Sequence, residues 1–180
     1  RLMSCPRLPR SAIGQVAALD LASTVGFAVG GFGARPRFGS VVLCGEEVVH
    51  RMAALREWLD EQDRFAAITA VVLEAAIIGR HRSTQAAEIL ISLQATARLW
   101  AFDVEVPLLT VGSGTARKQV LGTGRFPKGK AKRHVLAWAR AQGYETASLD
   151  AADALCLWHA VQQATQGQPP AAPGMFAAAR

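Results

Sequence analysis

The sequence predicts one α/β domain in which helices flank a five-stranded mixed sheet. Three short strand-like runs follow one another closely within the first 44 residues, and apolar strand-like runs then alternate with helical patterns. The chain has 180 residues, about half of them hydrophobic. This length is enough for one substantial core and too short for two ordinary domains.

The first three strands are predicted at 15–22, 26–32 and 37–44. The first is an apolar run that contains one acid, and only short turns separate the three strands. Strands joined so closely form an antiparallel meander. Apolar residues near helical spacing, with charges between them, then predict an amphipathic helix over 46–64.

The second half of the chain alternates between strands and helices. A continuous apolar run at 68–73 predicts a strand buried on both faces, and a Ser/Thr start introduces a long helix over 83–102. A further strand is expected at 104–111. A Gly-rich basic segment follows, and then helices are expected at about 130–142 and 149–163. With this order, three antiparallel strands precede two parallel ones.

The ends of the chain are predicted to lie outside the domain, which spans 15–164. Residues 1–14 are expected to form a flexible extension, and the Pro/Gly/Ala-rich residues 165–180 a disordered tail. The early arginines and prolines do not fit a signal peptide, and no apolar run is long enough to cross a membrane. Three widely separated cysteines fit a reducing compartment, so a cytoplasmic protein is expected.

The net charge of +6 is concentrated in one segment. Residues 117–133 contain seven basic side chains and no acid, and the rest of the chain carries a net charge of −1. Such a cluster suggests a loop that faces a polyanion, although basic clusters are often only solvated surface.

Two acids occur where the sequence predicts buried strands. Asp20 lies within the first strand, and Glu74 lies where the apolar run at 68–73 ends. An ionised carboxylate in such a place is costly unless it is paired or binds a cation. The alternative for Asp20 is a structural one, in which it caps the following turn through Ser23 or Thr24.

Asp150 and Asp153 lie three residues apart at the start of the last helix, and therefore on one face of its first turn. Acids are favoured there by the helix dipole whatever the function, so this pair alone has a structural explanation. Together, however, the four acids supply the oxygen ligands that Mg²⁺ or Mn²⁺ prefers. The histidines are scattered and are expected to be surface or packing residues, with His159 on the outer part of the last helix.

Four acids beside a basic segment fit phosphodiester hydrolysis with two metal ions. The basic side chains would then hold the phosphate backbone. The candidates for this role are Lys118, Arg125, Lys128, Lys130, Lys132 and Arg133.

The acids stand within three motifs: ALDLASTVGFAV around Asp20, AVVLEAA around Glu74, and LDAADALCLWHA at the start of the last helix, which is the most specific of the three. Together these motifs resemble the RuvC family of Holliday-junction resolvases. The resemblance covers about residues 16–163. It implies a ribonuclease H-like fold and a homodimer that pairs through the helix over 83–102. By this match, Asp20, Glu74, Asp150 and Asp153 become the catalytic acids that bind two Mg²⁺ or Mn²⁺ ions.

The resemblance further implies a crossover junction endonuclease that cuts four-way DNA, with roles in recombination or repair and no membrane partner. Phage-type members carry a basic residue after the fifth strand and another after a Gly-rich turn, which correspond to Lys118 and to Arg133 in GKAKR. The first turn reads LAST rather than Pro-Gly, which suggests a divergent branch of phage or prophage origin. Residues 75–78 offer no aromatic wedge, so strict selectivity for junctions is not expected.

Two alternatives remain open. One is a RuvC-like nuclease acting on forks, flaps or RNA hybrids, and the other is a nucleic-acid-binding protein without catalysis. Two phosphate-binding motifs fit poorly. The DLASTVG turn resembles the hairpin of actin-type ATPases, which need two such domains, and GRFPKGKA lacks the Ser/Thr of a P-loop.

Overall fold

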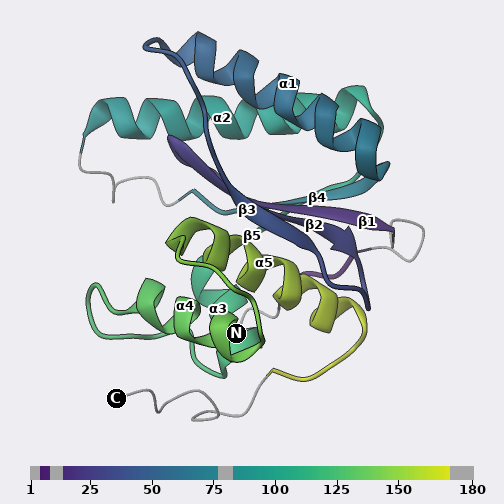
Figure 1. Ribbon diagram of the computed structural model, residues 1–180, viewed down its shortest axis with the longest axis vertical. Coiled ribbons are helices and arrows are strands. Elements are labelled where there is room, and N and C mark those ends of the chain that lie inside the picture. The colour runs from purple at the N-terminus through teal and green to yellow at the C-terminus, as the bar shows by residue number, and fades with distance from the viewer. Residues whose placement is uncertain (1–4, 9–13, 77–82, 171–180) are drawn as a thin grey trace.

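The computed structural model describes residues 5–8, 14–76 and 83–170. Its elements, in chain order, are β1 (Gln15–Asp20), β2 (Thr24–Gly31), β3 (Arg37–Val42), α1 (Val48–Ala66), β4 (Ile68–Glu74), α2 (Thr84–Asp103), β5 (Leu108–Val111), α3 (Ser113–Leu121), α4 (Ala131–Ala141) and α5 (Leu149–Thr165). Figure 1 shows a sheet with α1 and α2 on one side and α3, α4 and α5 on the other.

The five strands form one sheet in the order β3-β2-β1-β4-β5. β1 pairs with β2, and β2 with β3, in antiparallel fashion, whereas β4 runs parallel to β1 and β5 parallel to β4. The predicted α/β fold, with three antiparallel strands followed by two parallel ones, is confirmed.

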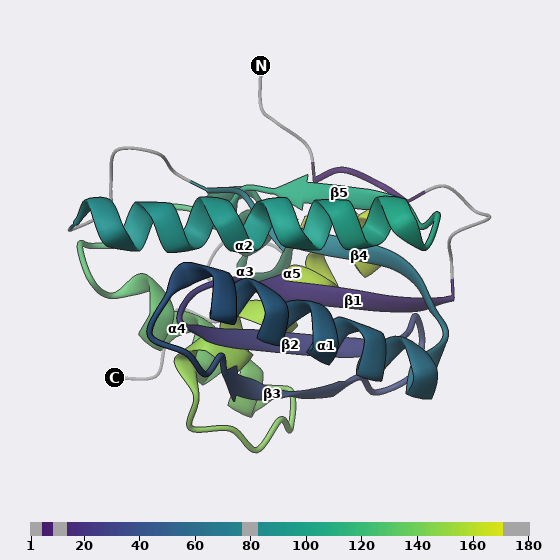
Figure 2. The ribbon, with the colours of Figure 1, turned by 90° about the horizontal axis from the view of Figure 1, so that it is seen from above.

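Alternate residues of the central strands face two separate cores. In β1, Ala17 and Leu19 pack with α1 and α2, while Val16 and Ala18 pack with α3, α4 and α5. Figure 2 looks onto the sheet from the side of α1 and α2, with α5 behind it. The last residue of β1, Asp20, is even-numbered and therefore belongs to the α5 face.

The helix α3 was not predicted from the sequence, which suggested an irregular Gly-rich segment there. Gly112 precedes the helix and Gly122 ends it in the left-handed conformation, with φ of 77°. Between them Ala116, Val120 and Leu121 are buried against the α5 face. Their helical spacing was present in the sequence, but the flanking glycines obscured it.

The strand predicted at 104–111 begins later, at Leu108. Helix α2 extends to Asp103, and Glu105 adopts a positive φ of 57° in the turn that follows. The parallel pairing with β4 starts only after this turn, where Leu108 lies opposite Val71.

Part of the predicted N-terminal extension is packed. Cys5 and Leu8 are buried in the core on the α5 face, and the backbone N–H of Leu8 donates to Thr165 Oγ1 at 3.1 Å. Residues 1–4 and 9–13 of the predicted extension lie outside the described residues, and so do residues 171–180 of the predicted tail. The boundaries of the domain stay a prediction.

The described helices include none with the length and apolar character needed to cross a membrane. All three cysteines are free thiols, with Cys5 and Cys156 buried and Cys44 exposed. Burial raises the pKa of the Cys5 thiol to about 11.

Candidate active site

The first two acids of the site stand at the ends of neighbouring parallel strands. Leu19 of β1 lies opposite Leu73 of β4, and Asp20 and Glu74 follow at the same edge of the sheet. The side-chain amide of Gln94 in α2 donates to the Glu74 carbonyl at 2.8 Å, which fixes the end of β4 from the other layer. The two acids that the sequence singled out therefore lie at neighbouring strand ends.

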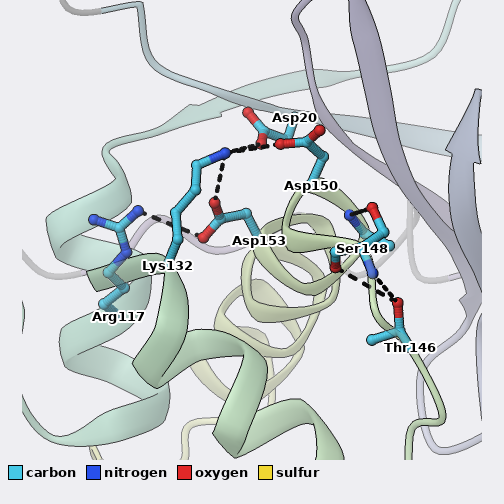
Figure 3. A network of polar contacts seen from close by, with 8 residues as sticks. Asp20, Arg117, Lys132, Thr146, Ser148, Asp150 and Asp153 are labelled. Atoms are coloured by element: carbon cyan, nitrogen blue, oxygen red, sulfur yellow. Dashed lines mark hydrogen bonds and ion pairs between the residues drawn. The ribbon is translucent and has the colours of Figure 1, made fainter. Parts of the chain in front are cut away.

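The other two acids come from the first turn of α5. Ser148 caps this helix, because its hydroxyl accepts a hydrogen bond from Ala151 N–H at 3.2 Å. Thr146 Oγ1 in turn accepts from Ser148 N–H at 3.1 Å, which orders the approach to the helix. Asp150 and Asp153 leave this turn on the side that faces the strand ends (Figure 3).

Lys132 of α4 joins the carboxylates of both elements. Its Nζ lies 2.8 Å from Asp150 Oδ1, 3.3 Å from Asp153 Oδ2 and 3.7 Å from Asp20 Oδ2. Figure 3 shows the ammonium group pointing into the space among the three acids. The sequence predicted Lys132 as one of several DNA-binding residues and gave no sign that it contacts the acids.

A second cation approaches from α3. Arg117 lies 3.5 Å from Asp153 Oδ1, and its side chain is 15% exposed. Asp153 itself is 4% exposed, and its Oδ2 makes no hydrogen bond among the described residues although Lys132 is within ion-pair distance. A buried carboxylate oxygen without a hydrogen bond is costly. Arg117 was counted in the basic segment but not proposed as a site residue.

Two of the acids, Asp20 and Glu74, have a raised pKa. Burial, followed by the charges of Glu74 and Asp153, raises the pKa of Asp20 to about 7, and Lys132 opposes this only in part. Burial and the charge of Asp153 also raise the pKa of Glu74, against the opposing effect of Arg117 and Ser113. Both shifts have the causes expected of carboxylates crowded in a poorly solvated place.

Asp20 does not cap the turn that follows it, which was the structural alternative. Ser23 Oγ instead accepts a hydrogen bond from Arg51 at 2.9 Å. Within the described structure, the cation paired with the Asp20 carboxylate is Lys132, at 3.7 Å.

The donor set suits a hard divalent cation, although its geometry is not that of a formed metal centre. No group of three or more His, Cys, Asp or Glu side chains in the described part of the chain is arranged to hold a metal ion. Three carboxylates nevertheless surround one positive charge, and one buried oxygen lacks a hydrogen bond. Oxygen ligands of this kind fit Mg²⁺ or Mn²⁺. Binding would require Lys132 to give up its contacts with the acids.

The other predicted basic residues lie around the α3–α4 connection. An open pocket of about 490 Å³ is lined by Lys118 and Arg125 together with Ser113 and Thr115 of α3. Ser113 also interacts with Glu74, so the pocket adjoins the acids. The remaining three are exposed: Lys128 and Lys130 precede α4, and Arg133 lies in its first turn.

His159 does not lie on the outer part of the last helix, as the sequence suggested. Its Nε2 is 2.8 Å from the Tyr144 hydroxyl, and its ring contacts Trp138 and Trp158 edge-on. Burial lowers the pKa of His159 to about 4. Through Trp138, this cluster packs the C-terminal part of α4, the helix that carries Lys132, against α5.

Comparison with solved structures gives three neighbours over most of the chain. RuvC from Thermus thermophilus is 22% identical with a TM-score of 0.65, over 87% of this chain and 98% of that one. The same protein in complex with a Holliday-junction substrate gives 20% and 0.68 over the same shares. The yeast mitochondrial Holliday-junction resolvase Ydc2 is 13% identical with a TM-score of 0.54, over 90% of this chain and 83% of that one.

No protein-family model and no curated protein matches the chain. The neighbours therefore show the fold, which this chain shares with RuvC and Ydc2. The predicted resemblance is confirmed at this level.

Proposed function

We propose that this chain is a metal-dependent endonuclease that cuts branched DNA, and four-way junctions in particular. The observation that carries the proposal is the cluster of four acids at the strand ends and the start of α5, in which burial, and then the neighbouring carboxylates, raise the pKa of Asp20 and of Glu74. Such a cluster is unfavourable for stability, which is typical of a functional site. The fold shared with two junction resolvases adds support.

Asp20, Glu74, Asp150 and Asp153 would hold two Mg²⁺ or Mn²⁺ ions. The ions would supply activation of water and stabilisation of the leaving oxygen at neutral pH. Asp153 is the most deeply buried of the three acids around Lys132, so its side chain would be the least mobile of the three ligands. Asp150, with a side chain 30% exposed, is the acid closest to solvent and to an approaching strand.

The basic residues would position the DNA and balance its charge. The pocket lined by Lys118 and Arg125 adjoins Glu74 and would hold a phosphate next to the one that is cut. Lys132, released from the acids, would interact with the phosphate under attack and offset its growing negative charge. Lys128, Lys130 and Arg133 would contact the backbone further away.

A homodimer would explain how two strands of a two-fold symmetric junction are cut together. The outer face of α2 offers the apolar surface for such pairing, with Ile91 50%, Leu99 56% and Phe102 80% exposed. These side chains lie on the layer opposite α5, so pairing there would leave both sets of acids accessible.

The proposal is tested by incubating the purified protein and Mg²⁺ with labelled four-way junction, fork, flap, RNA–DNA hybrid and linear duplex of matched sequence. Paired symmetric nicks in the junction, made faster than any cutting of the other substrates, are expected. Cutting of forks, flaps or hybrids instead would keep the nuclease and change its substrate, and the lack of an aromatic residue at Ala75 and Ala76 makes this the main alternative. Tight DNA binding without cleavage in either Mg²⁺ or Mn²⁺ would contradict the proposal and favour a binding protein.

A further inference from the structure

The first turn of α5 lies unusually close to β2, at a glycine. The even-numbered residues of β2 face α5, since Ala28 belongs to the core on that side while Val25 and Val29 belong to the opposite core. Gly26 and Gly30 are therefore also directed towards the helix. At the far end, Trp158 of α5 donates to the Gly30 carbonyl at 3.2 Å.

At Gly26 the close approach involves the backbone of the site itself. A Cβ there would overlap the carbonyl oxygen and carbon of Asp150 and would lie 3.0 Å from the nitrogen of Ala151. These are backbone atoms of the helix, so no change of side-chain rotamer can relieve the overlap. Any other residue would force the turn away from the strand by about 1 Å, the distance needed to restore the closest Cβ contact that proteins tolerate.

The same glycine is in register with the acid of the neighbouring strand. Asp20 in β1 lies directly opposite Gly26 in β2. One residue thus contacts the turn that carries Asp150 and Asp153 and pairs with the residue that supplies the third carboxylate. Its lack of a side chain determines how far the helix acids stand from the strand acid.

We propose that Gly26 is a positioning residue, which sets the spacing between the strand-end and helix carboxylates so that they can share a small divalent cation. This inference rests on the proposed metal-dependent function. Mg²⁺ needs oxygen ligands at about 2.0–2.1 Å in near-ideal octahedral geometry, whereas Ca²⁺ accepts longer and more variable distances of about 2.3–2.6 Å. A site widened by about 1 Å should therefore lose more affinity for Mg²⁺ than for Ca²⁺.

The test is calorimetric titration of wild type and Gly26→Ala with Mg²⁺ and with Ca²⁺. We expect the variant to bind Mg²⁺ at least about 10-fold more weakly and Ca²⁺ only about 2- to 3-fold more weakly. Gly30→Ala is the matched control, because it lies on the same face of the same strand but its Cβ would meet Pro36 Cα at 2.7 Å. It should lower the melting temperature while leaving the ratio of the Mg²⁺ and Ca²⁺ affinities unchanged.

Equal Mg²⁺ affinity in wild type and Gly26→Ala, or an equal loss for both metals, would overturn the inference alone. Lack of Mg²⁺ binding by the wild type would overturn the proposed function and this inference with it. If Gly26→Ala does not fold, Ser148→Ala takes its place, since it removes the hydrogen bond to Ala151 and frees the same turn. An unchanged preference for Mg²⁺ over Ca²⁺ in that variant would equally overturn the inference.

Discussion

The two layers that cover the sheet differ in what they do with their charged side chains. In the layer of α1 and α2, charges form isolated contacts, such as Asp60 accepting from Trp100 Nε1 at 2.7 Å and the half-exposed pair of Arg56 and Asp103. In the layer of α3, α4 and α5, Lys132 alone reaches three carboxylates. The first arrangement gives single polar groups a partner. The second brings several carboxylates together, and their mutual repulsion is relieved only by a cation.

The difference teaches where stability and chemistry are located in this fold. Alternate residues of the same strands supply an apolar core to both layers, and the acids Asp20 and Glu74 are added on the α5 face, where β1 and β4 end. Substitutions in the first layer should change stability and spare activity. Substitutions around the acids should do the reverse.

The largest contrast is expected between Asp20→Asn and Asp60→Ala. Asp20→Asn removes a charged ligand from the site and should lower Mg²⁺-dependent cleavage by at least about 10³-fold. Asp60→Ala leaves the indole N–H of the buried Trp100 without its acceptor and should cost about 1–3 kcal/mol of unfolding free energy. Cleavage rates on a four-way junction and urea denaturation of both variants measure the contrast. Equal activity of the two variants would remove the functional distinction between the layers.

A second contrast compares one cation from each layer, in Lys132→Met and Arg56→Met. Burial alone would lower the pKa of Lys132, but its hydrogen bond to Asp150 and the surrounding carboxylates raise it above the usual value, so the side chain stays charged. Loss of this charge should reduce the cleavage rate by about 10²-fold. Arg56→Met breaks an exposed pair worth less than about 1 kcal/mol and should leave the rate unchanged. Single-turnover kinetics would decide, and full activity of Lys132→Met would assign the lysine a purely structural role.

The smallest expected effect is on stability as a function of pH. Because the pKa of Asp20 is raised to about 7 in the folded protein, the native state holds a proton that the unfolded chain has already lost. The stability linked to this group is therefore present below about pH 4 and lost as the pH rises through 7. Without metal, wild type should lose roughly 1–2 kcal/mol relative to Asp20→Asn between pH 5 and 8, since the neighbouring acids share the proton.

Thermal unfolding of both proteins in EDTA and in Mg²⁺ checks this expectation. Mg²⁺ should restore the stability of wild type at pH 8 and have little effect on Asp20→Asn. Parallel stability curves for the two proteins would show that Asp20 titrates normally.

The sequence predicted the strands well and singled out four acids that the fold brings near one another, because these signals are local. An acid that ends an apolar run, as Glu74 does, is visible without any structure, and so is the spacing of Asp150 and Asp153. The order of parallel and antiparallel strands followed from the lengths of the connections. These features depend on patterns within a few residues or on chain length.

The missed features depend on distances across the fold. Lys132 is separated from Asp20 by more than a hundred residues, and nothing in the basic segment distinguished it from Lys130 or Arg133 as the residue that reaches the acids. The partly buried position of His159 also required the packing of Tyr144 and two tryptophans around it. Helix α3 is the exception, since its signal was local and the glycines at its ends concealed it.

The place of Lys132 has a thermodynamic consequence under the proposed function. The Lys132 ammonium cannot remain among the acids and also neutralise a DNA phosphate. A metal ion that displaces the lysine from the acids therefore frees it to bind DNA, and the two binding equilibria are linked. By linkage, bound metal must raise the affinity for DNA by the same factor by which bound DNA raises the affinity for metal. A chain with this arrangement would bind its ions more tightly once DNA is bound, and would bind DNA more tightly once its ions are in place.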